Sequence, residues 1–343
     1  MLIRGHAGVP DGEPGRHGLD TPDRYELLPV HEREIVRAPF DAISVQICAE
    51  NAEVIILTAD LAPYTDIYRL PKEKPRQFLD VGMAEQNLMC IAGGLAKTGF
   101  MPIATTFACY ATRRAFDQMV MSLGTGPSRG VVVGFAPGIA SAARVHHQAT
   151  DDLAMMRAVP GACVIDPADP TELMEALRAA IDHRGLVYLR GLRGEVSTLF
   201  KPGLRFEIGR ARALREQGGV GIISTGYGTQ WAVECSDVLQ QRGVAHSLLH
   251  VPVLKPAPVQ DIAVFCSRHR SVFTLENHNI IGGLGSLVAE VIATEGVPAR
   301  LHRAGISDRW AVNGDMRYIR DQLGLSAVQL AAQVEALECS DQK

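Results

Sequence analysis

The chain has 343 residues, of which 47% are hydrophobic and 21% charged, and its formal net charge is −4 at pH 7. This length is enough for two domains that each bury a hydrophobic core. The slightly acidic balance argues against a basic surface for nucleic acid or for an anionic membrane.

Seven cysteines, at positions 48, 90, 109, 163, 235, 266 and 339, are spaced singly along the chain, and none forms a Cys-x-x-Cys pair. This spacing is typical of reduced thiols and not of a disulfide framework or a zinc site. The first ten residues contain no sustained apolar stretch, and no run approaches the length of a membrane span. We therefore expect a cytoplasmic protein without a membrane anchor.

Residues 1–32 are rich in Gly, Pro, Asp, Glu and Arg and contain few bulky apolar side chains. This composition predicts an N-terminal extension that is loose or packs on another element, and not a domain.

From 33 to 192, short apolar runs alternate with amphipathic stretches. The apolar runs predict strands buried on both faces, at 54–58, 101–107, 130–134, 163–166 and 186–190. The amphipathic stretches predict helices at 36–50, 84–98, 110–122, 150–158 and 170–183. This alternation predicts a parallel sheet covered by helices.

Residues 193–215, with several glycines and a proline among polar side chains, are predicted to link two cores. The alternation then resumes, so residues 216–343 predict a second, smaller α/β domain. Its predicted strands are 220–225, 245–250, 271–275 and 299–302, and its predicted helices are 229–242 and one that begins near 285.

Glu85 is the most informative single residue. It follows a short apolar run and a glycine turn at the predicted start of a helix, close to Val81, Met83 and Leu88. An apolar pocket would favour the protonated form of this carboxyl, so that it could donate or share a proton near neutrality. The other interpretation is a solvated acid that the helix dipole stabilises.

Several motifs resemble those of a known family. The segment 78–118, which begins Phe-Leu-Asp-Val-Gly-Met-Ala-Glu-Gln-Asn-Leu, closely resembles the pyrimidine-binding domain of transketolases. The resemblance continues through 147–160 and 166–170, and 276–285 is similar to the beginning of the transketolase C-terminal domain. It implies an α/β fold with a parallel-sheet pyrimidine-binding domain for thiamine diphosphate, followed by the smaller α/β C-terminal domain.

One motif of thiamine diphosphate enzymes is missing from the sequence. These enzymes hold the diphosphate through a metal bound by Gly-Asp-Gly and a later Asn, and the nearest match here, Gly314, Asp315 and Met316, lacks the second glycine. The chain therefore looks like the C-terminal subunit of a split transketolase. The resemblance implies a separate N-terminal diphosphate-binding subunit that holds Mg²⁺ or a similar divalent ion, and a heterotetramer with two copies of each chain.

The resemblance also implies roles for residues at the cofactor. Glu85 corresponds to the glutamate that hydrogen-bonds the aminopyrimidine ring, and Phe107 and Tyr110 correspond to the aromatic residues that stack on it. Asp60 and Leu61 lie in a strand-end loop that touches the cofactor. Core packing for Phe107, and a turn cap for Asp60, are the structural alternatives.

Other positions match contacts with the substrate, which in this family is a ketose that gives a two-carbon ketol unit to an aldehyde. Arg37 and Arg190 match arginines that bind a sugar phosphate, and His147 matches a histidine that contacts the sugar. Arg144, together with His146, would suit an anionic or carrier-linked acceptor. A solvated helix start is the alternative for Arg37.

The sequence departs from the family at four positions of the substrate channel, one of which is Arg144 in the place of a glycine. Ala143 stands where transketolases carry an Asp that contacts the sugar, Ala136 replaces a second sugar-contacting histidine, and Tyr64 replaces a small hydroxyl residue. A lost polar group alters the choice of substrate strongly. We therefore expect a specialised C2 transfer, as in secondary metabolism, with an altered substrate channel.

Two other interpretations share this fold. One is the beta subunit of a 2-oxo acid dehydrogenase, which has the same glutamate and the same division into subunits. The other is a non-catalytic paralogue that assembles with a partner or regulates it, which Ala136 and Ala143 would favour and the retained Glu85 opposes.

Overall fold

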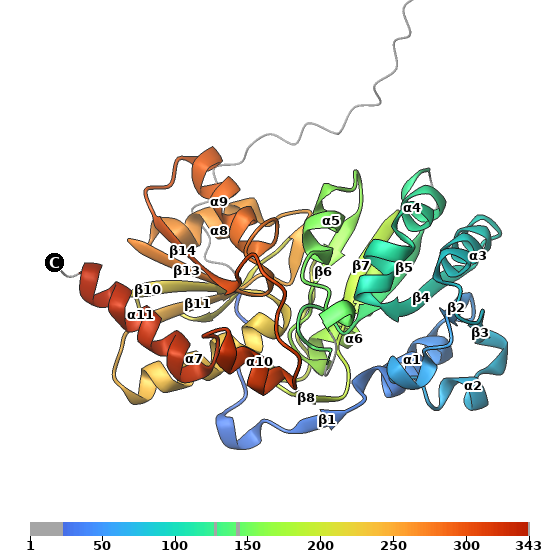
Figure 1. The fold of residues 1–343 in the computed structure, drawn as a ribbon, viewed down its shortest axis with the longest axis horizontal. Helices are drawn as coiled ribbons and strands as arrows, with labels where there is room; N and C mark the ends of the chain where they lie inside the picture. Colours follow the sequence, from blue (N-terminus) through green and yellow to red (C-terminus); the bar gives the residue numbers. More distant parts are fainter. Residues whose placement is uncertain (1–22, 127–128, 142–144, 342–343) are drawn as a thin grey trace, which may run out of the picture.

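Two β-sheets, each covered by helices on both faces, lie side by side in the computed structural model of the chain (Figure 1), which describes residues 23–126, 129–141 and 145–341. The first sheet has seven strands in the order β12-β6-β7-β5-β4-β2-β3, all parallel except β12. Its strands are β2 (Val54–Thr58), β3 (Phe78–Asp80), β4 (Met101–Phe107), β5 (Gly130–Phe135), β6 (Cys163–Ile165), β7 (Leu186–Gly191) and β12 (Val253–Lys255).

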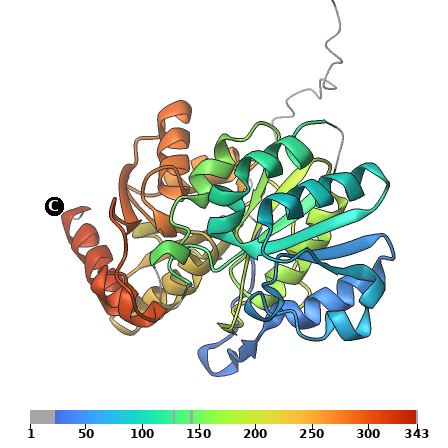
Figure 2. The same ribbon diagram turned by 45° about the vertical axis from the view of Figure 1, so that its right-hand side comes forward.

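Helices cover both faces of this sheet because successive side chains of its strands point to opposite sides. In β5, Val131 and Val133 belong to the core that contains Phe40, whereas Val132 belongs to the core that contains Met89. Figure 2 shows the two groups of helices on opposite sides of the sheet. The first core packs α1 (Pro39–Glu50) and α6 (Pro170–Asp182), and the second packs α3 (Glu85–Lys97), α4 (Phe116–Met119) and α5 (Asp152–Ala158).

Short helical turns connect these elements. They are η1 (Val30–Glu32), η2 (Ala62–Tyr64), α2 (Leu70–Glu73), η3 (Pro75–Gln77), η4 (Tyr110–Arg114), η5 (Val120–Gly124) and η6 (Val145–His147). Two of them, η4 and η5, are π-helical and flank α4, so the helix expected over 110–122 is interrupted. Such π-helical turns are frequent at functional sites.

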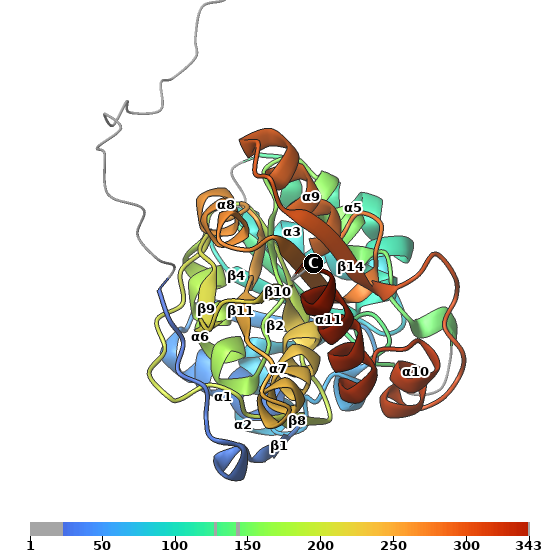
Figure 3. The same ribbon diagram turned by 90° about the vertical axis from the view of Figure 1, so that its left-hand side faces the viewer.

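The second sheet has five strands in the order β14-β13-β10-β11-β9. They are β9 (Arg212–Arg215), β10 (Val220–Ser224), β11 (His246–His250), β13 (Ser271–Asn279) and β14 (Arg300–Ile306). Figure 3 shows α8 and α9 on one side of this sheet and α7 and α11 on the other. These helices, with the short α10, are α7 (Gly226–Gln241), α8 (Val259–Ser267), α9 (Leu284–Glu295), α10 (Met316–Gln322) and α11 (Ala327–Asp341).

The predicted fold class is confirmed, and the differences lie in short elements. The segment 193–215 was predicted to be a linker, but it contains β9 and β8 (Glu195–Ser197), which pairs with β1 (Ile35–Arg37). β12 was not predicted, and it joins the first sheet although it follows β11 of the second. Strands of three or four residues show too little alternation to be read from a sequence.

The described part of the N-terminal extension packs on residues of the segment 193–215. The Tyr25 ring lies 5.1 Å from that of Phe200, centroid to centroid, and its backbone N–H donates to the Ala213 carbonyl at 3.2 Å. No helix in residues 23–126, 129–141 and 145–341 is long and apolar enough to cross a membrane.

A buried ion cluster joins the two sheets. Arg190, near the end of β7, donates from Nε to Asp152 at 2.8 Å and from Nη1 to Asp166 at 3.3 Å, and all three side chains are buried. Nη1 also donates to the Asn277 carbonyl of β13 at 3.2 Å. Although burial alone would raise the pKa of Asp152, the Arg190 charge lowers it, so the pair is ionised.

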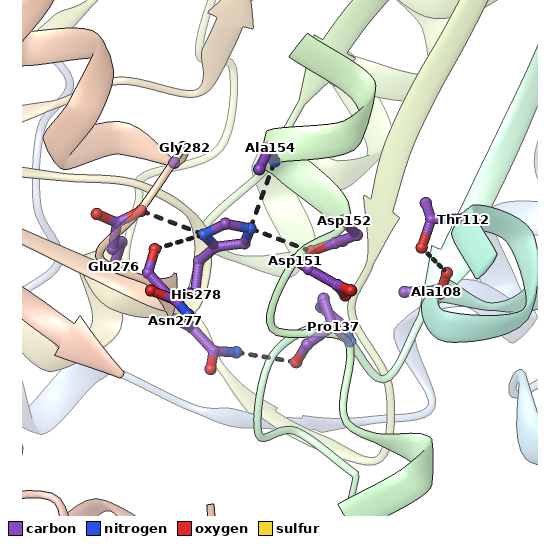
Figure 4. A network of polar contacts seen from close by, with 12 residues as sticks. Ala108, Thr112, Pro137, Asp151, Asp152, Ala154, Glu276, Asn277, His278 and Gly282 are labelled. Atoms are coloured by element: carbon purple, nitrogen blue, oxygen red, sulfur yellow. Dashed lines mark hydrogen bonds and ion pairs between the residues drawn. The ribbon is translucent and has the colours of Figure 1, made fainter. Parts of the chain in front are cut away.

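Residues of β13 complete this contact (Figure 4). The Asn277 side chain donates to the Pro137 carbonyl at 2.9 Å, and the Ile139 N–H donates to the Asn277 Oδ1 at 2.9 Å. His278 accepts the Ala154 N–H at 3.4 Å, and burial lowers the pKa of His278 to about 4, so the ring is neutral. Through these hydrogen bonds, the motif 276–285 holds the second sheet against the first.

We predict that Arg190→Met will lower the free energy of unfolding by about 3 to 5 kcal/mol, because it leaves the buried carboxylates of Asp152 and Asp166 without their counter-ion. Urea unfolding at pH 7 measures this. The control is Arg37→Met, which breaks an exposed pair with Glu195 and is expected to change stability by less than about 1 kcal/mol. Equal effects of the two substitutions would contradict the assignment.

A second prediction concerns Glu276, whose carboxylate accepts the Leu284 and Gly285 N–H groups at the start of α9. Burial raises the pKa of Glu276 from 4.5 to about 7. Between these two values the folded chain holds a proton that the unfolded chain has lost, so stability falls as the pH rises through this range, by on the order of 3 kcal/mol.

Glu276→Gln should remove this contribution. Unfolding of wild type and variant at pH 4.5 and pH 8 is compared, and wild type should lose more stability than the variant on going to the higher pH. Glu295→Gln, an exposed change at the end of α9, is the control and should follow wild type. The same pH slope in wild type and Glu276→Gln would show that Glu276 does not titrate in this way.

Candidate active site

A cavity of about 510 Å³ opens at the carboxyl ends of the parallel strands of the first sheet, the usual place for ligands in an open α/β sheet. Side chains that follow β2, β4, β5 and β7 meet there. The lining residues are Leu61, Tyr64, Phe107, Tyr110, Ser141, His147 and Arg193.

Aromatic rings form one wall of the cavity. Phe107 ends β4 and Tyr110 begins the π-helical turn η4, and their rings stack with centroids 5.6 Å apart and planes at 30°. The His147 ring lies 5.6 Å from Phe107 and 5.8 Å from Tyr110. Such a wall suits a flat heterocycle.

Glu85 is the first residue of α3, and only 4% of it is exposed. Its Oε1 accepts a hydrogen bond from Nη1 of Arg114 at 2.8 Å. The Arg114 guanidinium in turn lies over the Tyr110 ring, with Cζ 4.0 Å from the centroid. Glu85 is therefore buried, as the transketolase interpretation requires, and is linked to the aromatic wall through Arg114.

The strand-end loop after β2 contributes one of its two predicted residues to the lining. Leu61 lines the cavity, whereas the Asp60 side chain is exposed. Asp60 adopts a positive φ of 55°, and its N–H donates to the Asp80 carboxylate at 2.9 Å. A non-glycine residue in this conformation is uncommon, so the hydrogen bond to Asp80 helps to fix the loop.

The histidine segment is described only in part. His147 lines the cavity, and His146 is exposed with its ring 4.4 Å from that of His147. Arg144 and Ala143 lie outside the described residues. Ala136, which stands where the family has a histidine, is fully buried directly after β5.

Neither arginine predicted to bind a substrate phosphate lines the cavity. Arg190 is fully buried, and Asp152, Asp166 and a backbone carbonyl occupy its guanidinium. Its predicted role is therefore corrected: Arg190 lies in the contact between the two sheets, bonded to two carboxylates, and does not line the cavity. Arg37 is 83% exposed and pairs with Glu195 at 2.9 Å.

Two arginines near the wall were not singled out from the sequence. Arg193 follows β7 and lines the cavity, with its Cζ 5.7 Å from the Phe107 centroid. Its signal was its place just beyond a predicted buried strand, where ligand-binding loops gather. No sequence pattern pointed to Arg114. Its contact with Glu85 joins two helical elements and depends on how these elements pack.

Among residues 23–126, 129–141 and 145–341, no group of three or more His, Cys, Asp and Glu side chains is arranged to hold a metal ion. The groups at this site are thus a buried carboxylate paired with Arg114, aromatic rings, a histidine and Arg193. This set suits an organic ligand with a flat ring and an anionic group.

Comparison with known proteins places this site in a family. Residues 36–198 match the transketolase pyrimidine-binding domain, and residues 209–330 match the transketolase C-terminal domain. The chain belongs to the transketolase family, which implies dependence on thiamine diphosphate.

Two relatives of similar length match the chain over most of its residues. Over 301 residues the chain is 37% identical to the transketolase family protein y4mN of Sinorhizobium fredii, which covers 87% of each chain. Over 300 residues it is 30% identical to the 6-deoxy-6-sulfo-D-fructose transketolase subunit SqwH of a Clostridium species, covering 87% of this chain and 93% of that one.

A solved structure agrees with these relatives. A split-gene transketolase, described as an inactive beta4 tetramer, superposes with a TM-score of 0.81 at 32% identity and covers 89% of this chain and 98% of that one. The predicted resemblance to the C-terminal subunit of a split transketolase is therefore confirmed.

Proposed function

We propose that the chain, together with a separate diphosphate-binding subunit, transfers a two-carbon ketol unit from a ketose with an anionic group to an aldehyde. The observation that carries this proposal is the buried Glu85 carboxylate, which Arg114 links to the Tyr110 ring in the aromatic wall of the cavity. A buried carboxyl group is costly unless it has a partner, and here the partner is an arginine that also lies on the aromatic wall.

The residues present fit the aminopyrimidine end of thiamine diphosphate. Glu85 would hydrogen-bond a ring nitrogen, Phe107 and Tyr110 would pack on the ring, and Leu61 and Asp60 would lie along its edge. When bound, thiamine diphosphate supplies the electron sink for cleavage of a carbon–carbon bond. The chain itself shields the Glu85 proton site from water and orients the ring.

We assign the diphosphate and its divalent ion to a partner subunit. The sequence lacks the Gly-Asp-Gly motif, and the description of one relative as a subunit and of another as the product of a split gene supports this division. A heterotetramer with two copies of each chain would give two complete sites. His147, on the aromatic wall, would contact the sugar chain of the substrate.

We propose that Arg193 binds the anionic group of the substrate. Arg193 lines the cavity, whereas Arg190 is hydrogen-bonded within the ion cluster and Arg37 does not line the cavity. A guanidinium group binds phosphate or sulfonate oxygens through two N–H groups. The sulfosugar in the name of one relative makes a sulfonated ketose a reasonable first substrate to test.

The first prediction of this function is that Glu85→Gln lowers turnover by at least about 100-fold, since the amide cannot hold or release the proton at the ring nitrogen. The chain is reconstituted with its diphosphate-binding partner, thiamine diphosphate and Mg²⁺, and ketol transfer is measured. Glu53→Gln, a change at an exposed residue paired with Arg129, is the control and should leave turnover unchanged. Near wild-type turnover in Glu85→Gln would sink the proposal.

The second prediction is that Arg193→Met raises KM for an anionic ketose about tenfold, the loss of about 1.4 kcal/mol of binding, with a smaller effect on kcat. The KM for an uncharged ketose should stay the same, because no anion is bound. Arg184→Met, an exposed residue near the other end of the sheet, is the matched control. A similar rise in KM for charged and uncharged ketoses would argue against an anion contact.

A further inference from the structure

The Arg114 side chain makes the two contacts that we assign to the aminopyrimidine ring. Its planar guanidinium lies over the face of Tyr110, with Cζ 4.0 Å from the ring centroid. One of its N–H groups donates to Glu85 Oε1 at 2.8 Å. A flat group that is stacked on Tyr110 and bonded to Glu85 therefore occupies this place already in the chain alone.

We expect Arg114 and the cofactor ring to compete for one place, because both would bond to Glu85 and lie on Tyr110. Glu85 is only 4% exposed, whereas the Arg114 side chain is 51% exposed. A ring that bonds to Glu85 and lies on the same face of Tyr110 would take the position of the guanidinium. Because half of the Arg114 side chain already meets solvent, it can turn outward.

The backbone of Arg114 is held while its side chain is half-exposed. Arg114 ends the π-helical turn η4, and Gln86 of α3 donates to its carbonyl at 3.2 Å. Its neighbour Arg113 is fixed differently, by two hydrogen bonds to Asp151 at 2.7 and 3.0 Å. A rotation of the Arg114 side chain therefore needs no movement of the helix or of the wall.

We propose that Arg114 is an internal plug of the pyrimidine half-site. In the chain without cofactor it supplies the counter-ion that a buried carboxylate needs. On cofactor binding it leaves Tyr110 and Glu85 and turns toward solvent. This inference rests on the proposed function of Glu85, and it adds that cofactor binding must first break the ion pair, which lowers the apparent affinity.

The test uses the isolated full chain and a fragment of the cofactor, 4-amino-5-hydroxymethyl-2-methylpyrimidine, as the probe. Calorimetric titration is expected to show that Arg114→Ala binds the probe at least about tenfold more tightly than wild type, because no plug has to be displaced. Arg129→Ala, which removes another half-exposed, ion-paired arginine far from the cavity, is the matched control and should bind as wild type does.

Arg114→Lys is a second variant that keeps the test valid if the alanine variant does not fold. Lysine keeps the counter-ion of Glu85, but its ammonium cannot lie flat on Tyr110, so its affinity for the probe should lie between those of wild type and Arg114→Ala. Circular dichroism checks the fold of each variant. The plug is overturned if both variants bind the probe no more tightly than wild type does. It is also overturned if none of the three proteins binds the probe detectably.

A further variant separates failure of the plug from failure of the proposed function. Glu85→Gln combined with Arg114→Ala should lose the gain in probe affinity, because the hydrogen-bonding acid is gone. An inactive Glu85→Gln enzyme with no gain in Arg114→Ala overturns the plug alone. An active Glu85→Gln enzyme overturns the function on which the plug rests.

Discussion

The cost of a buried charge without a partner is the constraint on which this structure depends. Arg190, Asp152 and Asp166 are all buried where the two sheets meet, and each is tolerated only because the others are within hydrogen-bonding distance. The three residues come from β7, from the start of α5 and from the loop after β6, so the cluster forms only when these elements and β13 are correctly placed. The cluster therefore fixes the orientation of the strand ends that open into the cavity.

The same constraint shapes the site itself. Glu85 is a buried acid in the first turn of α3, and the fold gives it Arg114 as a partner. If a second chain completes this site, as we propose, the chain must be stable before the cofactor binds. An arginine would meet this requirement better than a permanent apolar cover, because it stabilises the carboxylate and is itself half-exposed.

Much of the fold and part of the site could be predicted from the sequence. The strand 54–58 is a nearly continuous apolar run, and 101–107 is rich in apolar and β-branched residues, so both positions could be predicted from composition. Phe107, Tyr110 and His147 then meet at the strand ends. The role of Arg190 could not be predicted in this way, because an arginine at the end of a buried strand looks the same whether it faces a ligand or two carboxylates. Whether Arg190 faces a ligand or two carboxylates depends on where Asp152 and Asp166 lie, and tertiary packing sets their positions.

The commitment of Arg190 to the domain contact also bears on substrate choice. A buried arginine that is bonded to two carboxylates cannot turn toward a phosphate without leaving them unpaired, at a cost that a single anion contact does not offset. An anion that enters the cavity must therefore find a positive charge on a side chain that is not part of the core. Arg193 lies three residues further along the chain, beyond the end of β7 and beside Phe107, where its charge faces the cavity without weakening the sheet contact. In the function that we propose, the arginine that supports the fold and the arginine that binds the substrate are different residues, so the substrate channel can vary while the fold stays the same.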